Sequence, residues 1–389
     1  MRYRTDPKTG KEISALGFGC MRLPFDSKKA EKLIMSAIEN GVNFFDTAYV
    51  YGNSETVLGN ILHKNGAREK VYIMTKAPFN KLKMYNDFDK MLQTQLARLK
   101  TDYIDYYLLH NISELRLWEN LKEIGIEKWI EEKKQSGQIR GFGFSFHGSR
   151  GDFLSLIGAY VWDICLIQYN YLDENYQAGR AGLCAAHERN IPVAIMEPLL
   201  GGKLAKGLPP KAVTLFKEID KKKSPASWAF KWLYNQPEVT VVLSGMNAME
   251  QLTDNLSAAE DSEPGVMTEA EAAVYEPVKE EIKKSYKIPC TGCNYCMPCP
   301  QKVNIPGCFT AYNASFSFGY LAGLAMYLTG LGMHQSEKKS SGRCCTKCGA
   351  CEGKCPQRID IPGSLETISK RMEPPWVRVI ITAAKKIMS

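Results

Sequence analysis

Two runs of four cysteines in the last third of the chain are the residues best suited to chemistry. Ten of the 13 cysteines fall between residues 290 and 355. The two runs are Cys290, Cys293, Cys296 and Cys299, then Cys345, Cys348, Cys351 and Cys355, and a proline follows each run. This spacing is typical of [4Fe–4S] sites, in which one tight loop supplies three thiolates and the fourth cysteine commonly binds the other cluster. The cysteines therefore predict two [4Fe–4S] clusters.

Crossed ligation divides the eight thiolates between the two clusters. It assigns Cys290, Cys293, Cys296 and Cys355 to one cluster, and Cys299, Cys345, Cys348 and Cys351 to the other. Structural zinc is the alternative, although zinc sites usually pair two Cys-x2-Cys units across a longer loop. Disulfides are disfavoured because the chain shows no secretory leader, and we expect a cytoplasmic protein.

Short apolar segments recur through the first 285 residues, with helical patterns between them. The predicted strands are Leu16–Gly19, Asn43–Asp46, Val71–Lys76, Ile104–His110, Arg140–Ser145, Ile164–Tyr169, Pro192–Met196 and Val239–Leu243. Eight strand–helix units predict an α/β fold, a closed (β/α)8 TIM barrel. An open dinucleotide-binding sheet is the alternative, but the Gly-x-Gly pairs at Gly17 and Gly141 lack the third glycine of its fingerprint.

Two smaller features complete the barrel region. Ser27 is expected to cap a helix that ends at Asn40-Gly41, because a hydroxyl side chain can accept a bond from the first free N–H groups of a helix. The segment Arg2–Ile13 is expected to form an added hairpin that turns at residues 8–10.

Polar residues follow the predicted strands in phase. They are Asp46, Lys76, His110, Ser145, Gln168, Glu197 and Ser244. The carboxyl ends of barrel strands build the active-site face of a TIM barrel. One such residue is usually a turn former, whereas seven in phase indicate a functional site.

The net charge of +8 arises entirely from residues 286–389. From residue 286 onward there are 13 Lys and Arg against 5 Asp and Glu, so residues 1–285 are formally neutral. Because thiolate-ligated clusters are anionic, the excess is interpreted as offsetting them, and no nucleic-acid partner is expected. A basic patch for an acidic partner or for DNA is the weaker alternative. We predict a barrel domain over residues 1–285 and a small α-rich ferredoxin-like di-cluster domain over 286–389.

Residues 303–333 carry no Asp, Glu, Lys or Arg. A membrane span here would put the two cysteine runs on opposite sides of a bilayer about 30 Å thick, which crossed ligation forbids. We therefore expect no membrane span, and predict an apolar helical insert that packs the cluster domain on its neighbour.

Over about residues 10–260 the chain resembles the aldo-keto reductase family, in the subgroup with a C-terminal 4Fe-4S ferredoxin-like domain. The motifs that carry the resemblance are FFDTAYVYGNSETVLG (Phe44–Gly59), Thr75-Lys76, LLH (Leu108–His110), GFSFH (Gly143–His147), IQYN (Ile167–Asn170), EPLLGGKL (Glu197–Leu204) and MEQLTDN (Met249–Asn255). The resemblance places the family's catalytic tetrad on Asp46, Tyr51, Lys76 and His110. It implies a small-molecule carbonyl substrate and a nicotinamide cofactor, NAD(H) or NADP(H).

The tetrad has a chemical reason of its own. Reducing a carbonyl needs a hydride on carbon and a proton on oxygen, and the nicotinamide supplies only the hydride. Tyr51 is the candidate proton donor, and Lys76, held by Asp46, is expected to lower the pKa of its phenol. His110 would orient the carbonyl and stabilise the developing oxyanion.

The resemblance also implies the cofactor-binding residues. They are Ser145 and Gln168 for the carboxamide, Gly201, Gly202, Lys203 and Leu204 for the pyrophosphate, and Ser244, Gly245, Gln251 and Asn255 for the adenosine end. Phe146 stands where many members have Asn, and Met196 replaces the usual stacking Tyr. The basic pair that grips a 2′-phosphate is absent, so we expect NADH to bind at least as tightly as NADPH.

Three functions compete at this point. The first is carbonyl reduction with a nicotinamide, with Tyr51 as proton donor and with the clusters either structural or relaying electrons. The second is a ferredoxin-coupled reductase that receives single electrons through the clusters, which needs a bridging carrier such as a flavin. The third is a non-enzymatic subunit that binds a redox partner protein, against which the intact tetrad counts.

Overall fold

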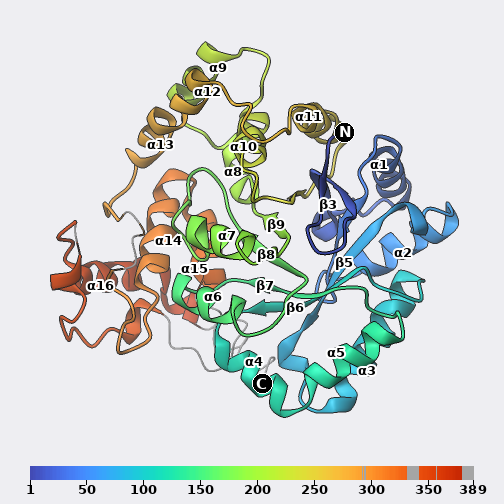
Figure 1. Ribbon diagram of the computed structural model, residues 1–389. Coiled ribbons are helices and arrows are strands. Elements are labelled where there is room, and N and C mark those ends of the chain that lie inside the picture. Colours follow the sequence, from blue (N-terminus) through green and yellow to red (C-terminus); the bar gives the residue numbers. More distant parts are fainter. Residues whose placement is uncertain (291, 293–294, 331–340, 356, 379–389) are drawn as a thin grey trace.

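The computed structural model describes residues 1–389 except 291, 293–294, 331–340, 356 and 379–389. Eight parallel strands form a closed barrel, in the order β10-β3-β4-β5-β6-β7-β8-β9, with helices around it (Figure 1). The barrel strands are β3 (Leu16–Gly19), β4 (Phe44–Asp46), β5 (Tyr72–Pro78), β6 (Tyr106–Ile112), β7 (Phe142–Phe146), β8 (Ile164–Gln168), β9 (Val193–Met196) and β10 (Val241–Ser244). The predicted (β/α)8 barrel is confirmed, and every predicted strand is present with its ends displaced by no more than two residues.

Helices connect the strands and cover the outside of the barrel. In the first 285 residues they are α1 (Ser27–Glu39), α2 (Ser54–Lys64), α3 (Tyr85–Leu99), α4 (Leu115–Glu123), α5 (Ile126–Gln135), α6 (Arg150–Ile157), α7 (Gly179–His187), α8 (Lys203–Lys206), α9 (Pro210–Ile219), α10 (Pro225–Tyr234), α11 (Met249–Glu260), α12 (Glu269–Ala273) and α13 (Tyr275–Lys283). Short 3-10 turns are η1 (Cys20–Arg22), η2 (Arg68–Lys70), η3 (Phe79–Lys81) and η4 (Leu200–Gly202). Apolar side chains spaced three and four residues apart bury one face of each long helix, as α3 does with Phe88, Leu92 and Leu99.

The start of α1 differs from the expectation in one respect. The helix begins at Ser27 and ends beside Asn40 as predicted, but the capping residue is Asp26. The Asp26 carboxylate accepts bonds from the backbone N–H groups of Lys28 and Lys29. The Asp26 carboxylate thus satisfies free N–H groups in the first turn of the helix, which is the role that the Ser27 hydroxyl was expected to play.

The predicted hairpin is confirmed as β1 (Tyr3–Thr5) paired antiparallel with β2 (Glu12–Ser14). Ile13 joins the buried side chains in the centre of the barrel. Tyr106, the first residue of β6, donates a hydrogen bond to Asp6 at 2.6 Å. The guanidinium of Arg4 donates to the carbonyls of Gln236 (2.9 Å) and Ser262 (3.0 Å). The hairpin therefore closes the amino-terminal end of the barrel.

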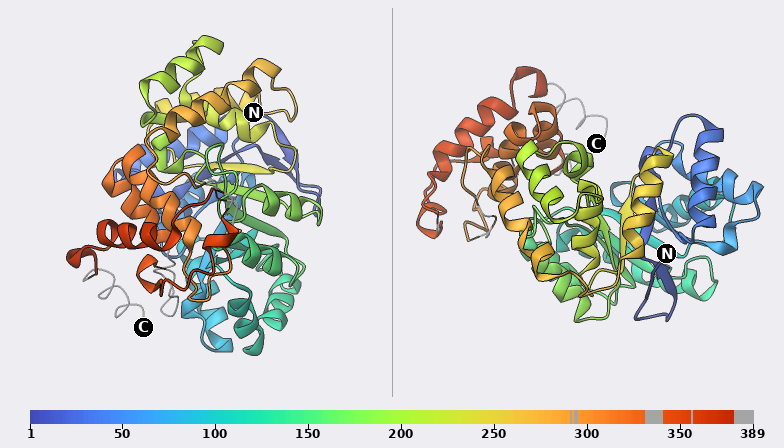
Figure 2. Two further views of the ribbon diagram at one scale, coloured as in Figure 1. Left: turned by 90° about the vertical axis from the view of Figure 1, so that its left-hand side faces the viewer. Right: turned by 90° about the horizontal axis from the view of Figure 1, so that it is seen from above.

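A second group of helices lies beside the barrel (Figure 2). These helices are α14 (Ile305–Ser317), α15 (Tyr320–Gly330) and α16 (Ile361–Met372), with the short turns η5 (Gly342–Cys344) and η6 (Glu352–Lys354). Their apolar residues form a hydrophobic core of their own, from Ile288 to Val377. The predicted domain boundary after residue 285 stays a prediction, although this separate core agrees with it.

The predicted apolar insert contains α14 and α15, and its last residues, 331–333, lie outside the described residues. No helix among the described residues is long and apolar enough to cross a membrane. Phe318 and Met326 of the insert pack against a barrel-side cluster that includes Leu200 and Leu204. Lys203 adds a bond to the carbonyl of Ala322 at 3.5 Å. The insert thus contacts the segment that follows β9.

The close contact between α2 and α3 generates a prediction about stability. A Cβ on Gly59 of α2 would lie 2.5 Å from backbone atoms of Arg98 and Leu99. We expect Gly59→Ala to lower the free energy of unfolding by about 1–3 kcal/mol, because the helices must separate. Urea unfolding measures this, and Gly151→Ala in α6, where the nearest atom is 3.9 Å away, is the matched control. Equal stability of the two variants would contradict the close approach.

Candidate functional site

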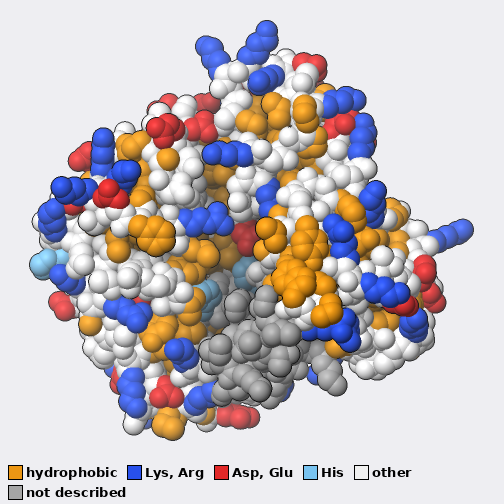
Figure 3. Space-filling model, turned by 180° about the vertical axis from the view of Figure 1, so that it is seen from behind, with side chains coloured by type: hydrophobic (Ala, Val, Ile, Leu, Met, Phe, Trp, Pro, Cys, Tyr) orange, Lys and Arg blue, Asp and Glu red, His pale blue; other side chains and the backbone are white. Residues whose placement is uncertain are grey.

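The carboxyl ends of the barrel strands gather the predicted polar residues on one face. Asp46 ends β4, Gln168 ends β8 and Ser244 ends β10. Lys76, His110 and Ser145 lie in β5, β6 and β7, within two residues of the strand ends. Seen from behind, the molecule is hollowed, and acidic and histidine side chains are visible in the hollow (Figure 3).

Lys76 lies at the centre of the predicted tetrad. Its ammonium group donates to the carboxylate of Asp46 and, at 2.8 Å, to the backbone carbonyl of Thr47. The side chain is 1% exposed, so burial alone would lower its pKa. Asp46 and Tyr51 outweigh burial and raise the pKa of Lys76, which therefore stays a cation at neutral pH.

Tyr51 and His110 lie on the open side of this ion pair. The Lys76 ammonium is 4.8 Å from the centroid of the Tyr51 ring. The His110 ring meets the Tyr51 ring edge-on, with 5.7 Å between their centroids. Burial raises the pKa of the Tyr51 phenol, while the charge of Lys76 and its hydrogen bond to the phenol oppose that rise. The structure thus brings all four predicted tetrad residues together, and both Tyr51 and His110 are half-buried.

A buried carboxylate, Glu55, lies behind the tetrad, and the sequence favours a helix cap over a functional role for the pair Ser54-Glu55. Glu55, in the first turn of α2, accepts bonds from Thr75 at 2.7 Å, Gln95 at 2.5 Å and Arg98 at 3.0 Å. Gln95 also donates to the carbonyl of Lys76 at 3.2 Å. This network ties α2 and α3 to the strand that carries Lys76. The only sequence signal was a carboxylate in the first turn of a helix, which ordinarily indicates a favourable helix-dipole contact.

At the end of β8 a second buried carboxylate, Asp173, fixes Gln168. The Gln168 side-chain amide donates to Asp173 at 3.1 Å, and the Asn170 side chain accepts from the backbone N–H of Asp173 at 3.0 Å. Burial, together with the nearby Glu197, raises the pKa of Asp173 to about 6, although the bonds from Gln168 and Asn170 oppose the rise. With its nitrogen committed to Asp173, Gln168 retains its amide oxygen as a hydrogen-bond acceptor.

Charged residues crowd the segment after β9. Glu197 is exposed to solvent on one side, while protein atoms surround its carboxylate on the others. Burial raises the pKa of Glu197, while Lys203 and Arg22 oppose the rise. Arg22, directly after β3, reaches Gly201, where an added Cβ would lie 3.9 Å from its guanidinium. Sequence reasoning missed Arg22, since a single basic residue after a strand carries no pattern.

The remaining predicted cofactor residues lie along the same rim. The Ser145 hydroxyl accepts from the backbone N–H of Asn111 at 2.7 Å, and Asn255 donates to Ser244 at 2.7 Å. Gln251 accepts from the backbone N–H of Asn247 at 2.9 Å. Gly201 and Gly202 have positive φ, Lys203 and Leu204 begin α8, and Gly245 follows β10. Phe146 is fully buried against Phe153, with ring centroids 5.1 Å apart.

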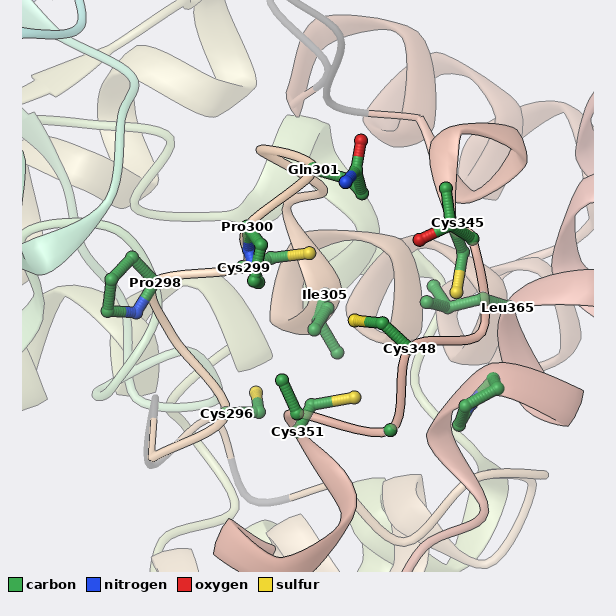
Figure 4. A pocket seen from close by; sticks show the side chains of 14 residues that line it. Cys296, Pro298, Cys299, Pro300, Gln301, Ile305, Cys345, Cys348, Cys351 and Leu365 are labelled. Carbon is green, nitrogen blue, oxygen red and sulfur yellow. The ribbon is translucent and has the colours of Figure 1, made fainter.

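Five of the predicted cluster ligands line one pocket (Figure 4). They are Cys296, Cys299, Cys345, Cys348 and Cys351. Burial raises the pKa of Cys351, and Cys345, Cys299 and Cys348 raise it further because they lie close by. Cys290 and Cys355 are half-buried, and Cys293 lies outside the described residues. Within the described residues, no three His, Cys, Asp or Glu side chains form a group that could hold a single metal ion.

The loop between β8 and α7 connects the barrel face to the first cysteine run. The side chain of Asn175 lies 3.6 Å from where a Cβ on Gly292 would be. Glu174 pairs with Lys279 of α13. Tyr286, which precedes Cys290, interacts electrostatically with both Asp173 and Cys290. The beginning of the first cysteine run therefore lies against this loop of the barrel.

Two family models match the chain. The one described as "Aldo/keto reductase family" matches residues 15–263, and the one described as "4Fe-4S dicluster domain" matches residues 289–361. A curated relative, the uncharacterized oxidoreductase YqkF of Bacillus subtilis, is 28% identical over 329 residues, covering 74% of this chain and all of the relative.

Solved structures share the barrel. Aldo-keto reductase AKR11C1 from Bacillus halodurans has a TM-score of 0.61 at 24% identity, covering 72% of this chain and 96% of that one. An aldo-keto reductase from Klebsiella pneumoniae in complex with NADPH has a TM-score of 0.60 at 20% identity, covering 72% and 95%. At these identities the likeness shows the fold alone.

The raised pKa of Asp173 predicts how stability depends on pH. Its folded-state pKa of about 6 lies above the ordinary value of 3.8, so the folded chain binds this proton more tightly than the unfolded chain. The stabilisation is present at low pH and is lost as pH rises through about 6. Relative to Asp173→Asn, we expect the wild type to lose roughly 1 kcal/mol of unfolding free energy between pH 5 and pH 7. Urea unfolding at both pH values measures it, and parallel behaviour of the two proteins would refute the assignment.

Proposed function

The chain belongs to the aldo/keto reductase family and carries a 4Fe-4S dicluster domain, and from this premise we propose that it is an oxidoreductase that reduces an aldehyde or ketone. Hydride would come from NAD(H) or NADP(H), and Tyr51 would donate the proton. The position of Lys76, between the Asp46 carboxylate and the Tyr51 ring, is the observation that carries the proposal.

Tyr51 is suited to move a proton because of the charges behind it. When the phenol gives its proton to a carbonyl oxygen, a phenolate forms in a buried position, where a charge is costly. Lys76 compensates that charge, since its hydrogen bond and its positive charge both favour the phenolate. Asp46 keeps Lys76 in place through the buried ion pair. The three residues thus act as one proton-donating unit.

His110 is the second group beside the reacting oxygen. Its ring stands edge-on to Tyr51, so a carbonyl oxygen that accepts from the phenol also lies near the imidazole. An imidazole N–H there stabilises the negative charge that develops on the oxygen. His110 therefore orients the substrate in this proposal, and Tyr51 supplies the proton.

The rim residues fit a nicotinamide nucleotide, whose bound form supplies the hydride. The Gln168 amide, oriented by Asp173, offers an acceptor for a carboxamide N–H. Gly201 and Gly202 have no side chains to block a pyrophosphate, and Arg22 and Lys203 bring positive charge beside them. Between Ser244 and Leu256 there is no Lys or Arg for a 2′-phosphate, so we propose that NADH binds at least as tightly as NADPH.

For the C-terminal domain we propose two [4Fe–4S] clusters with crossed ligands. Cys299 would complete the set Cys345, Cys348 and Cys351, and its presence in the same pocket supports this assignment. Cys290, Cys293, Cys296 and Cys355 would hold the other cluster. Such thiolates persist in a reducing compartment, and we place the protein in the cytoplasm.

The proposed clusters make a ferredoxin-coupled reductase the second candidate function. A ferredoxin-coupled reductase would take single electrons through them, and the contact between the first cysteine run and the β8–α7 loop favours some communication with the barrel. Spectra recorded anaerobically before and after NADH addition separate the two functions. Bleaching of the cluster bands indicates coupling to the nicotinamide, and unchanged bands indicate a structural role.

We expect Tyr51→Phe to abolish carbonyl reduction and to leave nucleotide binding unchanged within about twofold, because the hydroxyl acts on the proton and not on the cofactor. Turnover assays on a panel of aldehydes and ketones measure the first effect. Calorimetric titration with NADH and with NADPH measures the second and compares the two nucleotides. Tyr49→Phe, on the same loop, is the matched control and should keep its activity. Near-wild-type turnover by Tyr51→Phe would exclude this tetrad as the catalytic group.

The crossed ligand sets predict how iron is lost from cysteine variants. The wild type should hold about eight irons per chain, and Cys299→Ala and Cys348→Ala should each hold about four. The double variant Cys299→Ala/Cys348→Ala should also hold about four, because both residues serve one cluster. Cys184→Ala, a half-buried thiol of the barrel, is the control and should keep about eight. If the double variant lost both clusters, Cys299 would belong to the other set.

A further inference from the structure

A basic groove borders the second cysteine run. This groove is a hollow of about 270 Å³ lined by Arg343, Lys347, Lys370, Arg378 and Glu366, together with Cys345. The groove therefore contains four cationic side chains and one carboxylate. Cys345 also lines the pocket that holds Cys299, Cys348 and Cys351, so the groove and the proposed second cluster share a wall.

Ion pairs and a backbone hydrogen bond connect the charged side chains of the groove. Glu366 pairs with Lys347 at 2.7 Å and with Lys370 at 2.8 Å. These two ammonium groups lower the pKa of Glu366 to about 2, so it stays ionised. Arg378 is anchored at the end of α16 by a bond from Nε to the carbonyl of Glu373 at 2.8 Å.

The groove lies on the outer side of the cluster domain. Helix α16, which supplies Glu366 and Lys370, is on the side turned away from the barrel in Figure 1 and in the right-hand view of Figure 2. On the other side, Gly292 in the first cysteine run lies against Asn175 of the barrel. The second cysteine run includes the exposed Cys348, so a macromolecule in solution can approach this side of the domain.

We propose that the basic groove is the docking site of an acidic electron-carrier protein. The second cluster, held by Cys299, Cys345, Cys348 and Cys351, would exchange one electron with a docked carrier, so that one would be oxidised as the other was reduced, with no bond made or broken. The proposal rests on the proposed clusters but is independent of carbonyl reduction. It also gives the positive charge of the C-terminal region a role besides offsetting the clusters.

A carboxylate-rich protein surface fits the groove better than a nucleic acid does. Glu366 lies between two lysines and repels a continuous phosphate backbone, whereas separate carboxylates on a protein can pair with the outer cations. Trp376, 49% exposed and two residues from Arg378, offers an aromatic contact of the kind enriched in protein interfaces. A carrier docked in the groove would also lie beside Cys345, so the path for an electron between the carrier and the proposed second cluster would be short.

Binding of a plant-type [2Fe–2S] ferredoxin, a small acidic carrier, tests the proposal on the full cluster-loaded chain. Anaerobic calorimetry in 20 mM and 200 mM salt gives the dissociation constant. We expect salt to weaken wild-type binding about tenfold, and Lys347→Gln/Lys370→Gln to weaken it about tenfold at low salt. Glu366→Gln should tighten binding, because it removes the carboxylate that lies among the cations of the groove. Lys122→Gln/Lys217→Gln, on exposed barrel helices, is the matched control and should change it less than twofold.

Iron analysis of each variant shows whether the clusters are intact. If the double variant Lys347→Gln/Lys370→Gln lost iron, the single variants Lys370→Gln and Glu366→Gln would be used in its place. Both of these positions are far from the cysteines in sequence. An unchanged dissociation constant in the charge variants would overturn the proposal, as would tighter binding of a 20-base-pair DNA duplex than of ferredoxin. Tyr51→Phe should bind ferredoxin normally, so a failure of the proposed carbonyl reduction leaves this result separate.

Discussion

The buried ion pair between Lys76 and Asp46 constrains much of the barrel around it. Removing two charges from water costs several kcal/mol each, and only close pairing with further hydrogen bonds offsets that cost. The backbone carbonyl of Thr47 supplies such a bond, and the Glu55 network holds the strand of Lys76 through Gln95. Moving β4 relative to β5 by one residue would turn one partner away and leave a buried charge unpaired. The register of these strands is thus fixed by electrostatics as well as by packing.

Features that repeat along the chain could be predicted from the sequence, whereas contacts made once could not. Eight strands and their polar ends follow from periodic patterns, and the structure confirms the strands within two residues. The cysteine spacing likewise predicted a cluster domain that the family model confirms. Glu55 accepts bonds from residues 20 to 43 positions away, and the bond between Asp173 and Gln168 reaches into an irregular loop. Neither set of contacts belongs to a pattern that repeats along the sequence, so only the folded structure reveals them.

The small domain is built around its thiolates as much as around its apolar core. Six described cysteines, among them Cys290 and Cys355, are half-buried and pack against that core. Thiolates brought together without a bound group repel one another and raise the pKa values of their neighbours, as Cys351 shows. Binding a cluster removes that repulsion, so cluster loading and folding are coupled in such domains. The insert helices α14 and α15 contribute to this core while also contacting the barrel.

The hairpin at the amino-terminal end of the barrel separates a structural end from a polar end. Ile13 adds to the apolar side chains that fill the barrel, and Arg4 bonds to carbonyls at the rim. A packed interior divides the two ends of a TIM barrel, so that one end serves stability while the other is free to vary in chemistry. The exposed residues of this three-residue strand pair can therefore change without contacting the polar face.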